Sequence, residues 1–323
     1  MIANSGEYRK KNGQRGYVMM NNFIFENKTK VYFGKGGVKE YLGGLLANFG
    51  ETVMLAYGGG SIKCNGVYDE IMGILNAQGK CVVEFSGIMS NPTYAKVQEG
   101  AKLAHENHVD LILAVGGGSV SDCCKVISGA FDTLSHAMET YFGKPDENNL
   151  SDDINEAVMR SVIRNIRILL TDPENYDARS ELAQASAMAE NGVLKIGKVT
   201  DFQAHQIQHQ LGAYTDCNHG AGLAVIHPVL YRHIYKSGTA RFTRWAQNVW
   251  GIAPKGSDEE TAAAGIDVLA AFIKEIGLPT SFAELGIPAD TDFRAIADST
   301  VFTPGCCKKL THDEIYEILQ ECL

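Results

Sequence analysis

The stretch "VDLILAVGGGSVSD" (109–122) decides the fold of this chain. An apolar, β-branched run ends in three glycines and passes into a predicted helix. The same order recurs in "TVMLAYGGG" (52–60), which is followed by "SIK". Short apolar runs that end in glycine are typical of buried strands, and a glycine turn between a strand and a helix is typical of a parallel sheet.

The residues around these two stretches repeat the alternation of strand and helix. "KVYFG" (30–34) and "KCVVEFSG" (80–87) are predicted strands. Residues 67–79 and 93–108 have apolar side chains every three or four positions and are predicted helices. Strands that alternate with helices predict a parallel sheet with crossover helices. We therefore expect a Rossmann-like α/β nucleotide-binding domain over residues 20–129.

The second half of the chain has almost no strand pattern. Helical spacing covers 153–170, 178–193, 239–250 and 260–277. "SDEE" (257–260) and "THDE" (311–314) have the pattern of capping boxes at helix starts. Residues 130–323 are therefore predicted to form an all-helical domain. The expected fold class is α/β plus all-α.

Composition and charge limit the function classes. The 323 residues carry a net charge of −9 and no long basic run, which argues against nucleic acid as a partner. No apolar run approaches the roughly 18 residues of a membrane span. Eight cysteines without a CxxC motif predict reduced thiols and a cytoplasmic protein. Residues 1–19 are basic without an apolar core, so we expect a leader or extension there.

Both glycine turns stand where a backbone can hold a phosphate. Glycine permits close approach to an anion, and the following helix N-terminus adds positive potential. Two tight turns without a ligand are the alternative. An ordinary dinucleotide fold places an acidic residue after its second strand to hold the adenosine ribose. The turn at 57–63 has Gly58, Gly59, Ser61 and Lys63 and no carboxylate, which favours NADP(H) over NAD(H).

Histidine gathers in "DFQAHQIQHQLGAYTDCNHG" (201–220). His205 and His209 lie four apart in a predicted helix, and His219 follows in a predicted loop. "FDTLSHAMETYF" (131–142) adds Asp132 and His136, four apart on one face of a predicted helix. One carboxylate and three imidazoles would suit Fe(II) or Zn(II), with room for an exogenous oxygen ligand. A single histidine is more often structural than a ligand, so spacing alone leaves both interpretations open.

Taken together, "YGGGSIK" (57–63), "GGGSVSD" (116–122), "DTLSHAMETYF" (132–142) and "HQIQHQLGAYTDCNHG" (205–220) resemble the iron-containing (group III) alcohol dehydrogenases. The resemblance is to their butanol dehydrogenase-like, NADP-dependent members in particular. It extends from about Asn22 to the C-terminus. It implies the dehydroquinate synthase-like fold, with a nucleotide-binding domain before a helical metal-binding domain, and a homodimer.

The resemblance also implies a role for each residue that matches a motif. Asp132, His136, His205 and His219 match the metal ligands. His209 matches a histidine that does not bind the metal but lies beside the nicotinamide, where it relays a proton. The residues that match coenzyme-binding positions are Gly58, Gly59, Ser61 and Lys63 for the 2′-phosphate, Asn91 for the adenosine side, and Gly116, Gly117, Gly118, Ser119 and Asp122 for the pyrophosphate.

The chain departs from the family pattern in one place. The family has several tens of residues between the "GGGSxxD" helix and the Asp–x3–His helix, and they include a threonine-rich turn that contacts the nicotinamide end of the coenzyme. Here "DCCKVIS" (122–128) runs directly into "GAFDTLSH" (129–136). We therefore expect a segment to be absent between Ser128 and Phe131.

The function that the resemblance implies is hydride transfer between NADP(H) and small primary alcohols or aldehydes of the butanol and butanal kind. Fe(II) is the expected metal, with Zn(II) as the alternative. Two other interpretations stay open. A dehydroquinate synthase-like lyase would need a basic phosphate-binding pocket, and the helical half has no lysine–arginine cluster beside the histidines. An inactive remnant would bind metal and nucleotide without turnover.

Overall fold

A computed structural model describes residues 30, 32, 34–88, 94–116, 123–144 and 148–323. The chain divides between Val126 and Ile127 into two compact units. The first is an α/β unit and the second is helical, in the order that the sequence predicts. Each unit is described by itself.

The α/β unit is built on a parallel sheet with the strand order β2-β1-β3. Its strands are β1 (Thr52–Tyr57), β2 (Cys81–Phe85) and β3 (Leu111–Val115). Thr52 pairs with Cys81 on one side of β1, and Val53 pairs with Leu111 on the other. The central strand β1 is the most apolar of the three, and five of its six residues are buried. The first glycine turn and Gly116 therefore follow neighbouring strands, at the same edge of the sheet.

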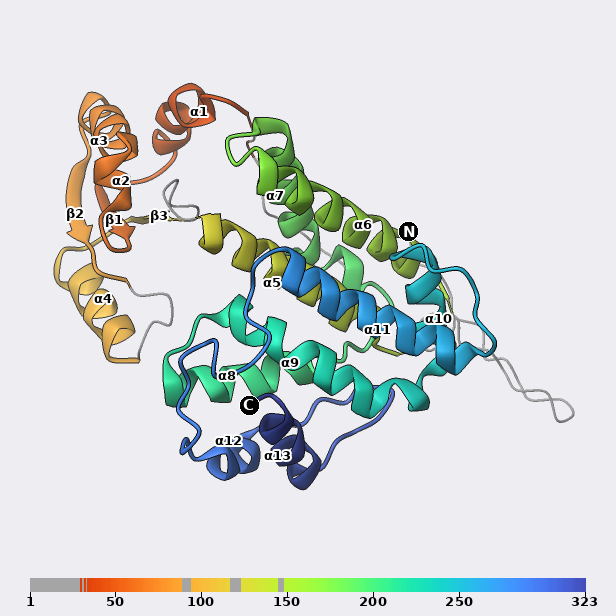
Figure 1. Ribbon diagram of the computed structural model, residues 1–323. Helices are drawn as coiled ribbons and strands as arrows, with labels where there is room; N and C mark the ends of the chain where they lie inside the picture. The colour runs from red at the N-terminus through yellow and green to blue at the C-terminus, as the bar shows by residue number, and fades with distance from the viewer. Residues whose placement is uncertain (1–29, 31, 33, 89–93, 117–122, 145–147) are drawn as a thin grey trace, which may run out of the picture. The chain divides into compact units, whose positions relative to one another are not determined.

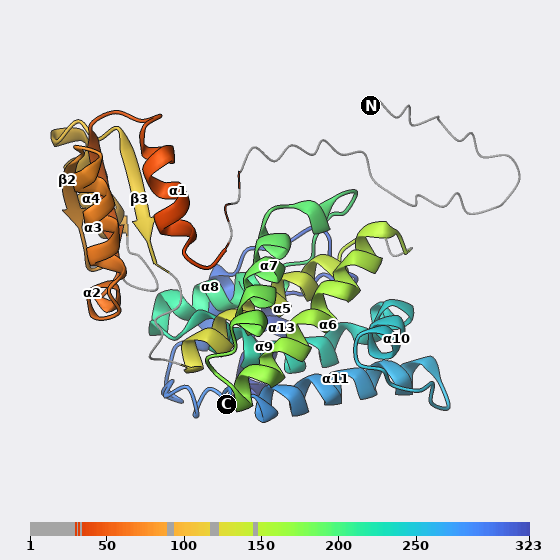
Figure 2. The same ribbon diagram turned by 90° about the horizontal axis from the view of Figure 1, so that it is seen from above.

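Helices cover both faces of this sheet (Figure 2). α1 (Gly37–Leu46) and α3 (Val67–Ala77) pack with Val53 and Leu55 on one face. α4 (Tyr94–Glu106) packs on the other face, where Met54 and Phe85 are buried. A short helix, α2 (Ser61–Cys64), follows the first glycine turn.

Two features of this unit differ from expectation. "KVYFG" (30–34) was expected to be a strand, but the residues of this stretch that the structure describes, Lys30, Tyr32 and Gly34, lie in none. A strand needs a ladder partner, and none pairs with this stretch among the described residues. α1 was not expected, because Gly43 and Gly44 interrupt its apolar pattern.

The second unit consists of helices (Figure 1). The neighbours α6 and α7, α8 and α9, α10 and α11, and α12 and α13 pack against each other. Their bounds are α5 Cys123–Tyr141, α6 Leu150–Thr171, α7 Tyr176–Glu190, α8 Gln203–Thr215, α9 His219–Ile234, α10 Thr239–Asn248, α11 Asp258–Glu275, α12 Phe293–Ser299 and α13 His312–Glu321, with 3₁₀ turns η1 Val193–Lys195 and η2 Tyr235–Ser237. The junction at which a missing segment is expected lies inside α5.

Side-chain caps begin several of these helices where the sequence predicts them. Thr311 and Glu314 form a complete capping box at the start of α13. Ser257 accepts a hydrogen bond from the Glu260 amide at the start of α11. A capped start satisfies amide donors that would otherwise lack partners, which stabilises a helix by about 1 kcal/mol.

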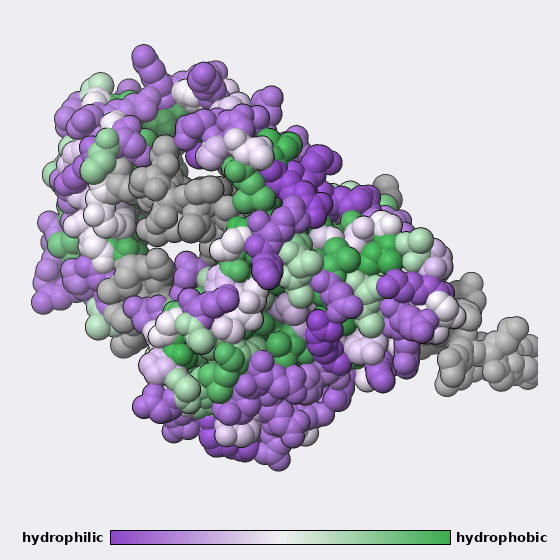
Figure 3. Space-filling model, in the orientation of Figure 1, coloured by the Kyte–Doolittle hydropathy of each residue, from purple (hydrophilic) through white to green (hydrophobic). Residues whose placement is uncertain are grey.

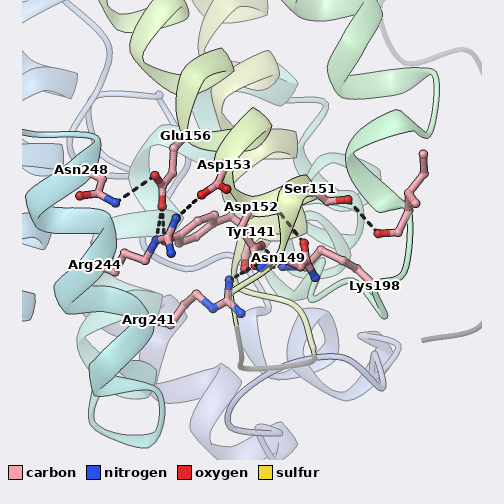
Figure 4. A network of polar contacts seen from close by, with 11 residues as sticks. Tyr141, Asn149, Ser151, Asp152, Asp153, Glu156, Lys198, Arg241, Arg244 and Asn248 are labelled. Carbon is pink, nitrogen blue, oxygen red and sulfur yellow. Dashed lines mark hydrogen bonds and ion pairs between the residues drawn. The ribbon is translucent and has the colours of Figure 1, made fainter. Parts of the chain in front are cut away.

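A buried ion network joins α5, α6 and α10 with the segment before α8 (Figure 4). Asp152 of α6 accepts a hydrogen bond from the Lys198 ammonium and forms an ion pair with the Arg241 guanidinium at 2.7 Å. The Asp152 and Lys198 side chains are 0% exposed and that of Arg241 is 5% exposed. Buried charges must be paired, because an uncompensated charge in the interior is very unfavourable.

The same network continues toward α10. Glu156 accepts hydrogen bonds from the Tyr141 hydroxyl at 2.9 Å and from Arg244 Nε at 2.6 Å. Arg244 also donates to Asp153 at 2.5 Å. Burial and the neighbouring Glu156 carboxylate raise the pKa of Tyr141 above its ordinary value, so its hydroxyl stays a donor. The network fixes the C-terminal end of α5, the helix that carries Asp132 and His136.

The surface of the helical unit is mixed. On the face drawn in Figure 3, hydrophobic residues of this unit form separate small patches among hydrophilic ones. Among the described residues, none of the helices has the length and apolar character that crossing a membrane requires.

Candidate metal centre and coenzyme-binding turn

Three helices bring the four expected metal ligands together. α5 carries Asp132 and His136 one turn apart, α8 carries His205, and α9 begins with His219. His219 was expected in a loop, and that expectation is wrong. Asn218 caps α9 by accepting a hydrogen bond from the Ala221 amide at 3.0 Å, so the helix starts one residue later, at His219.

The ligand atoms lie at distances that one cation could span. Asp132 Oδ1 is 3.4 Å from both His205 Nε2 and His219 Nε2. His136 Nε2 is 3.7 Å from Asp132 Oδ1 and 3.0 Å from His205 Nε2. Atoms bound to one metal by bonds of about 2.0–2.2 Å lie about 3.0–3.5 Å apart. Asp132, His205 and His219 each offer a ligand atom within 4.8 Å of the others, and His136 is outside this set of three.

Asp132 gives the strongest indication that a cation belongs here. Its Oδ1 is buried and has no hydrogen-bond partner. Burial opposes ionisation of this carboxyl, but the His205 and His219 rings, each with its Nε2 atom 3.4 Å from Oδ1, outweigh it and hold the pKa well below its usual range. A buried, ionised oxygen that faces imidazole nitrogens is what a divalent cation requires, so the residues fit the metal that the resemblance implies.

Glu139, which sequence reasoning missed, stands behind His205. One of its carboxylate oxygens forms a hydrogen bond with His205 Nδ1. The other accepts a hydrogen bond from the Ala204 backbone amide at 2.6 Å. Burial alone would lower the pKa of His205, but the Glu139 and Asp132 carboxylates raise it to about 9. Glu139 follows His136 by three residues on α5, and this helical spacing is the signal that could have identified it.

Gln208 has the same role for His219. The Gln208 Oε1 atom bonds to His219 Nδ1, which leaves His219 Nε2 directed toward Asp132. Hydrogen bonds to the second ring nitrogen select the tautomer and the orientation of a metal-binding histidine. Phe202 packs its ring 5.0 Å from that of His205 and 5.3 Å from that of His136, so the two rings are also held by apolar contact.

His209 lies beside this cluster. It is exposed, and its ring stacks on that of His219 with centroids 5.4 Å apart and planes inclined by 22°. Burial and the nearby His205 and His219 lower the pKa of His209. It is not among the residues whose ligand atoms converge. Its place one turn beyond His205 leaves it next to the ligands and open to solvent.

A second glutamate that sequence reasoning missed reaches the cluster from another helix. Glu190 is the last residue of α7, and its Oε1 lies 2.9 Å from His136 Nε2. Its side chain is 51% exposed. Glu190 is separated from His136 by more than fifty residues, so no local spacing could have indicated this contact.

The first glycine turn links β1 to α2. Gly60 has a φ of +104°, a conformation that favours glycine. A Cβ atom at Gly58 would lie 3.2 Å from the Ile88 carbonyl oxygen, so the turn is closely packed against the residues after β2. Gly59 has open space around its Cα. Such a turn leaves little room for a side chain at its first glycine.

A carboxylate reaches this turn from β2, although the turn itself has none. Glu84 accepts hydrogen bonds from the Tyr57 and Tyr68 hydroxyls, each at 2.5 Å. Lys63 Nζ lies 3.4 Å from Glu84 Oε2. The three bonds lower the pKa of Glu84, with Tyr57 contributing most. The sequence of the turn did not indicate this neighbour, which reaches Lys63 because β1 and β2 pair side by side.

Of the remaining residues expected to bind the coenzyme, the structure describes one, Gly116. Gly116 directly follows β3, at the sheet edge where the first glycine turn also lies. The others, Asn91, Gly117, Gly118, Ser119 and Asp122, lie outside the residues that the structure describes.

Comparison with known proteins identifies relatives for nearly the whole chain. The family model for iron-containing alcohol dehydrogenase matches residues 28–157, and that for the C-terminal part of the Fe-containing alcohol dehydrogenase family matches 126–323. A probable NADH-dependent butanol dehydrogenase 2 of Bacillus subtilis is 30% identical and aligns with 94% of this chain and 100% of its own length. The NADPH-dependent aldehyde reductase YqhD of Escherichia coli is 26% identical over 83% of this chain and 90% of its own.

Solved structures agree. The crystal structure of NADH-dependent butanol dehydrogenase A from Thermotoga maritima has a TM-score of 0.87 and 26% identity, and it covers 95% of this chain and 100% of its own. The B. subtilis alignment runs over 392 positions, more than the 323 residues here, so this relative has many positions without a counterpart. On matches that together span residues 28–323, the chain belongs to the iron-containing alcohol dehydrogenase family.

Proposed function

We propose that this protein is a metal-dependent alcohol dehydrogenase that works mainly as an aldehyde reductase on small primary alcohols and aldehydes. The convergence of Asp132, His205 and His219, with His136 beside His205 and a buried Asp132 Oδ1 that makes no hydrogen bond, carries the proposal. Fe(II) is the proposed metal, and the same donors suit Zn(II). The named relatives, which include butanol dehydrogenases and an aldehyde reductase, support the substrate class.

The metal would be held by Asp132 and the three histidines, and when bound it supplies a Lewis acid that polarises the substrate oxygen. Asp132 contributes the negative charge that offsets the cation. Glu139 and Gln208 keep His205 and His219 in the orientation that presents Nε2 to the centre. Phe202 packs an apolar ring against the rings of His205 and His136.

His209 is the proposed proton carrier. An imidazole has a donor on one ring nitrogen and an acceptor on the other, so it can take a proton from solvent and pass one to a substrate oxygen. Its exposure and its stacking on His219 give it access to both. The His209→Ala variant should retain bound metal and lose turnover; loss of metal from it would assign His209 to the ligands instead.

For the coenzyme we propose NADP(H), although the relatives include both NADH- and NADPH-dependent enzymes. Gly58, Gly59 and Ser61 leave no carboxylate within the turn. The Lys63–Glu84 pair is 49% and 41% exposed, and such pairs are worth only about 0–1 kcal/mol, so Lys63 can turn to a phosphate group at small expense.

The coenzyme proposal is tested by fluorescence titration with NADPH and NADH. The parent should bind NADPH more tightly, and Gly59→Asp should reverse the preference, because the new carboxylate repels a 2′-phosphate and accepts a ribose hydroxyl. Gly73, which faces open space on α3, offers the matched control Gly73→Asp. Equal affinity of the parent for both coenzymes would contradict the proposal.

The activity is tested with protein loaded anaerobically with Fe(II) and assayed with NADPH and butanal. NADPH oxidation that depends on butanal supports the dehydrogenase. A protein that binds metal and NADPH without turnover is the second candidate, and the positions that the longer relatives have and this chain lacks favour it. The lyase interpretation predicts neither NADPH binding nor oxidation.

The homodimer and the cytoplasmic location stay predictions. Six cysteines form no disulfide in the structure, which supports a reducing compartment; they are Cys64, Cys81, Cys217, Cys306, Cys307 and Cys322. Light scattering coupled to size-exclusion chromatography measures the oligomeric state.

A further inference from the structure

We propose that Glu190 is a fifth protein ligand of the metal centre in the substrate-free enzyme. The inference rests on the proposed metal site and adds to it a residue from α7, a helix that carries none of the four expected ligands. It starts from one contact: Glu190 Oε1 lies 2.9 Å from His136 Nε2, the nitrogen that would bind the metal.

The distance is the first argument. Two donors bound to the same metal at about 2.1 Å and at right angles to each other lie about 3 Å apart. The separation of Glu190 Oε1 and His136 Nε2 is of this size, as is the 3.0 Å between the Nε2 atoms of His136 and His205. If His136 Nε2 binds a cation instead of donating to Glu190, the Glu190 oxygen is within reach of the same cation.

Charge is the second argument. With Asp132 alone, the centre would hold one carboxylate against a divalent cation and three neutral imidazoles. Glu139 bonds to His205 and the Ala204 amide, so both of its oxygens are occupied away from the centre. Glu190 Oε1 contacts His136, and the only other cation that acts on this carboxylate in the structure's described part is Lys195, through its charge. A second carboxylate would neutralise the centre and favour a metal that accepts hard oxygen donors and five ligands, as Fe(II) does.

The position of Glu190 lets it act reversibly. It is the last residue of α7, and half of its side chain is exposed, so it can swing into solvent without disturbing packed neighbours. The other ligands lie within helices or are fixed by Glu139 and Gln208. Glu190 therefore fills the fifth position when no substrate is present and leaves it when one enters.

The test uses the full-length protein stripped of metal and reloaded with Co(II), whose visible spectrum reports coordination number. Glu190→Gln keeps a hydrogen-bond acceptor for His136 but removes the charge, and Glu190→Ala removes both. Glu181→Gln is the matched control, since Glu181 is exposed on the same helix and its recorded contact is a 3.4 Å bond from Ser161. Affinity is measured by competition with a chelator, and azide probes the open coordination position.

We expect both Glu190 variants to bind Co(II) at least about tenfold more weakly than the parent and Glu181→Gln. We also expect the more intense visible absorption of four-coordinate Co(II) and tighter azide binding. Weaker affinity with an unchanged spectrum would mean that Glu190 only holds His136, and would overturn the proposal. Parent-like affinity and spectrum would overturn it as well. A parent that binds no metal would instead refute the proposed function.

Discussion

The two units differ in how completely their apolar surfaces are covered. In the helical unit, Phe131, Leu134 and Tyr141 of α5 are 0% exposed, on the helix that carries Asp132 and His136. In the α/β unit, β1 is buried but β3 alternates between half-buried and exposed residues, and Ile112 is 59% exposed. Among the described residues, no strand pairs with the outer edge of β3.

The difference in apolar covering matters for function, because the proposed metal site and the coenzyme turns lie in different units. The proposed metal ligands stand in the unit with the fully buried core. The coenzyme turns stand on a narrow sheet with an open edge, and the aligned relatives have positions that this chain does not. We infer that metal binding is the better preserved of the two properties, and the following predictions test this inference.

The largest effect is expected for His205→Ala. Removal of one ligand leaves an incomplete set around the cation, so affinity should fall by more than about 100-fold, beyond what an outer hydrogen-bond partner usually contributes. Metal analysis after dialysis measures this directly. The control is His233→Ala, because His233 pairs with Glu321 on another face of the unit. A full equivalent of metal in His205→Ala would contradict the ligand assignment.

The second prediction concerns turnover. Hydride transfer needs the donor carbon about 3–3.5 Å from the carbonyl, and a misplacement of about 1 Å lowers the rate roughly 100-fold. We expect the Fe(II)-loaded chain to reduce butanal about 100-fold more slowly than the B. subtilis relative under the same conditions, while both bind one metal. Equal kcat/KM values, with an intact mass of 35.1 kDa for this chain, would show that its α/β unit is sufficient.

The third prediction is a pH dependence of metal binding. Since the pKa of His205 is raised to about 9, its proton must leave before a cation binds, and affinity should rise about tenfold per pH unit up to pH 9. The same shift stabilises the metal-free fold fully below pH 6.5, and this stabilisation is lost as the pH rises through 9. Calorimetric titration in buffers of different ionisation enthalpy measures the proton released. A flat profile from pH 6.5 to 9 would contradict the pairing with Glu139.

The smallest effect is expected for Glu139→Gln. The amide still bonds to His205 Nδ1 but no longer attracts a proton, so the pKa of His205 should fall. Metal affinity at high pH should fall only about tenfold. This is the lower end of the roughly 10- to 100-fold loss caused by removing a hydrogen-bond partner of a metal ligand. A histidine NMR titration of the metal-free protein gives the pKa. The control is again Glu181→Gln, because Glu181 is exposed. Glu156 is unsuitable because it is buried and paired with Arg244.

Local sequence patterns predicted most of the elements, and the family resemblance implied the four proposed metal ligands, but neither indicated the three glutamates. The capping box at Thr311 and the Asp132–His136 spacing are contained within one helical turn, so the sequence displays them directly. Glu84, Glu139 and Glu190 act through contacts with Lys63, His205 and His136, which come from other strands or helices. His219 begins α9 instead of lying in a loop, because Asn218 caps this helix.

The buried network around Asp152 limits how this protein can evolve. Lys198 and Arg241 come from different parts of the helical unit, and both meet the same buried carboxylate. Loss of one partner would strand a buried charge and destabilise the fold by about 3–5 kcal/mol, whereas a joint replacement by apolar side chains is often neutral. The three positions should therefore show strong epistasis and change together in a lineage. A deep mutational scan of pairs would find that second substitutions rescue first ones here more often than elsewhere in α6.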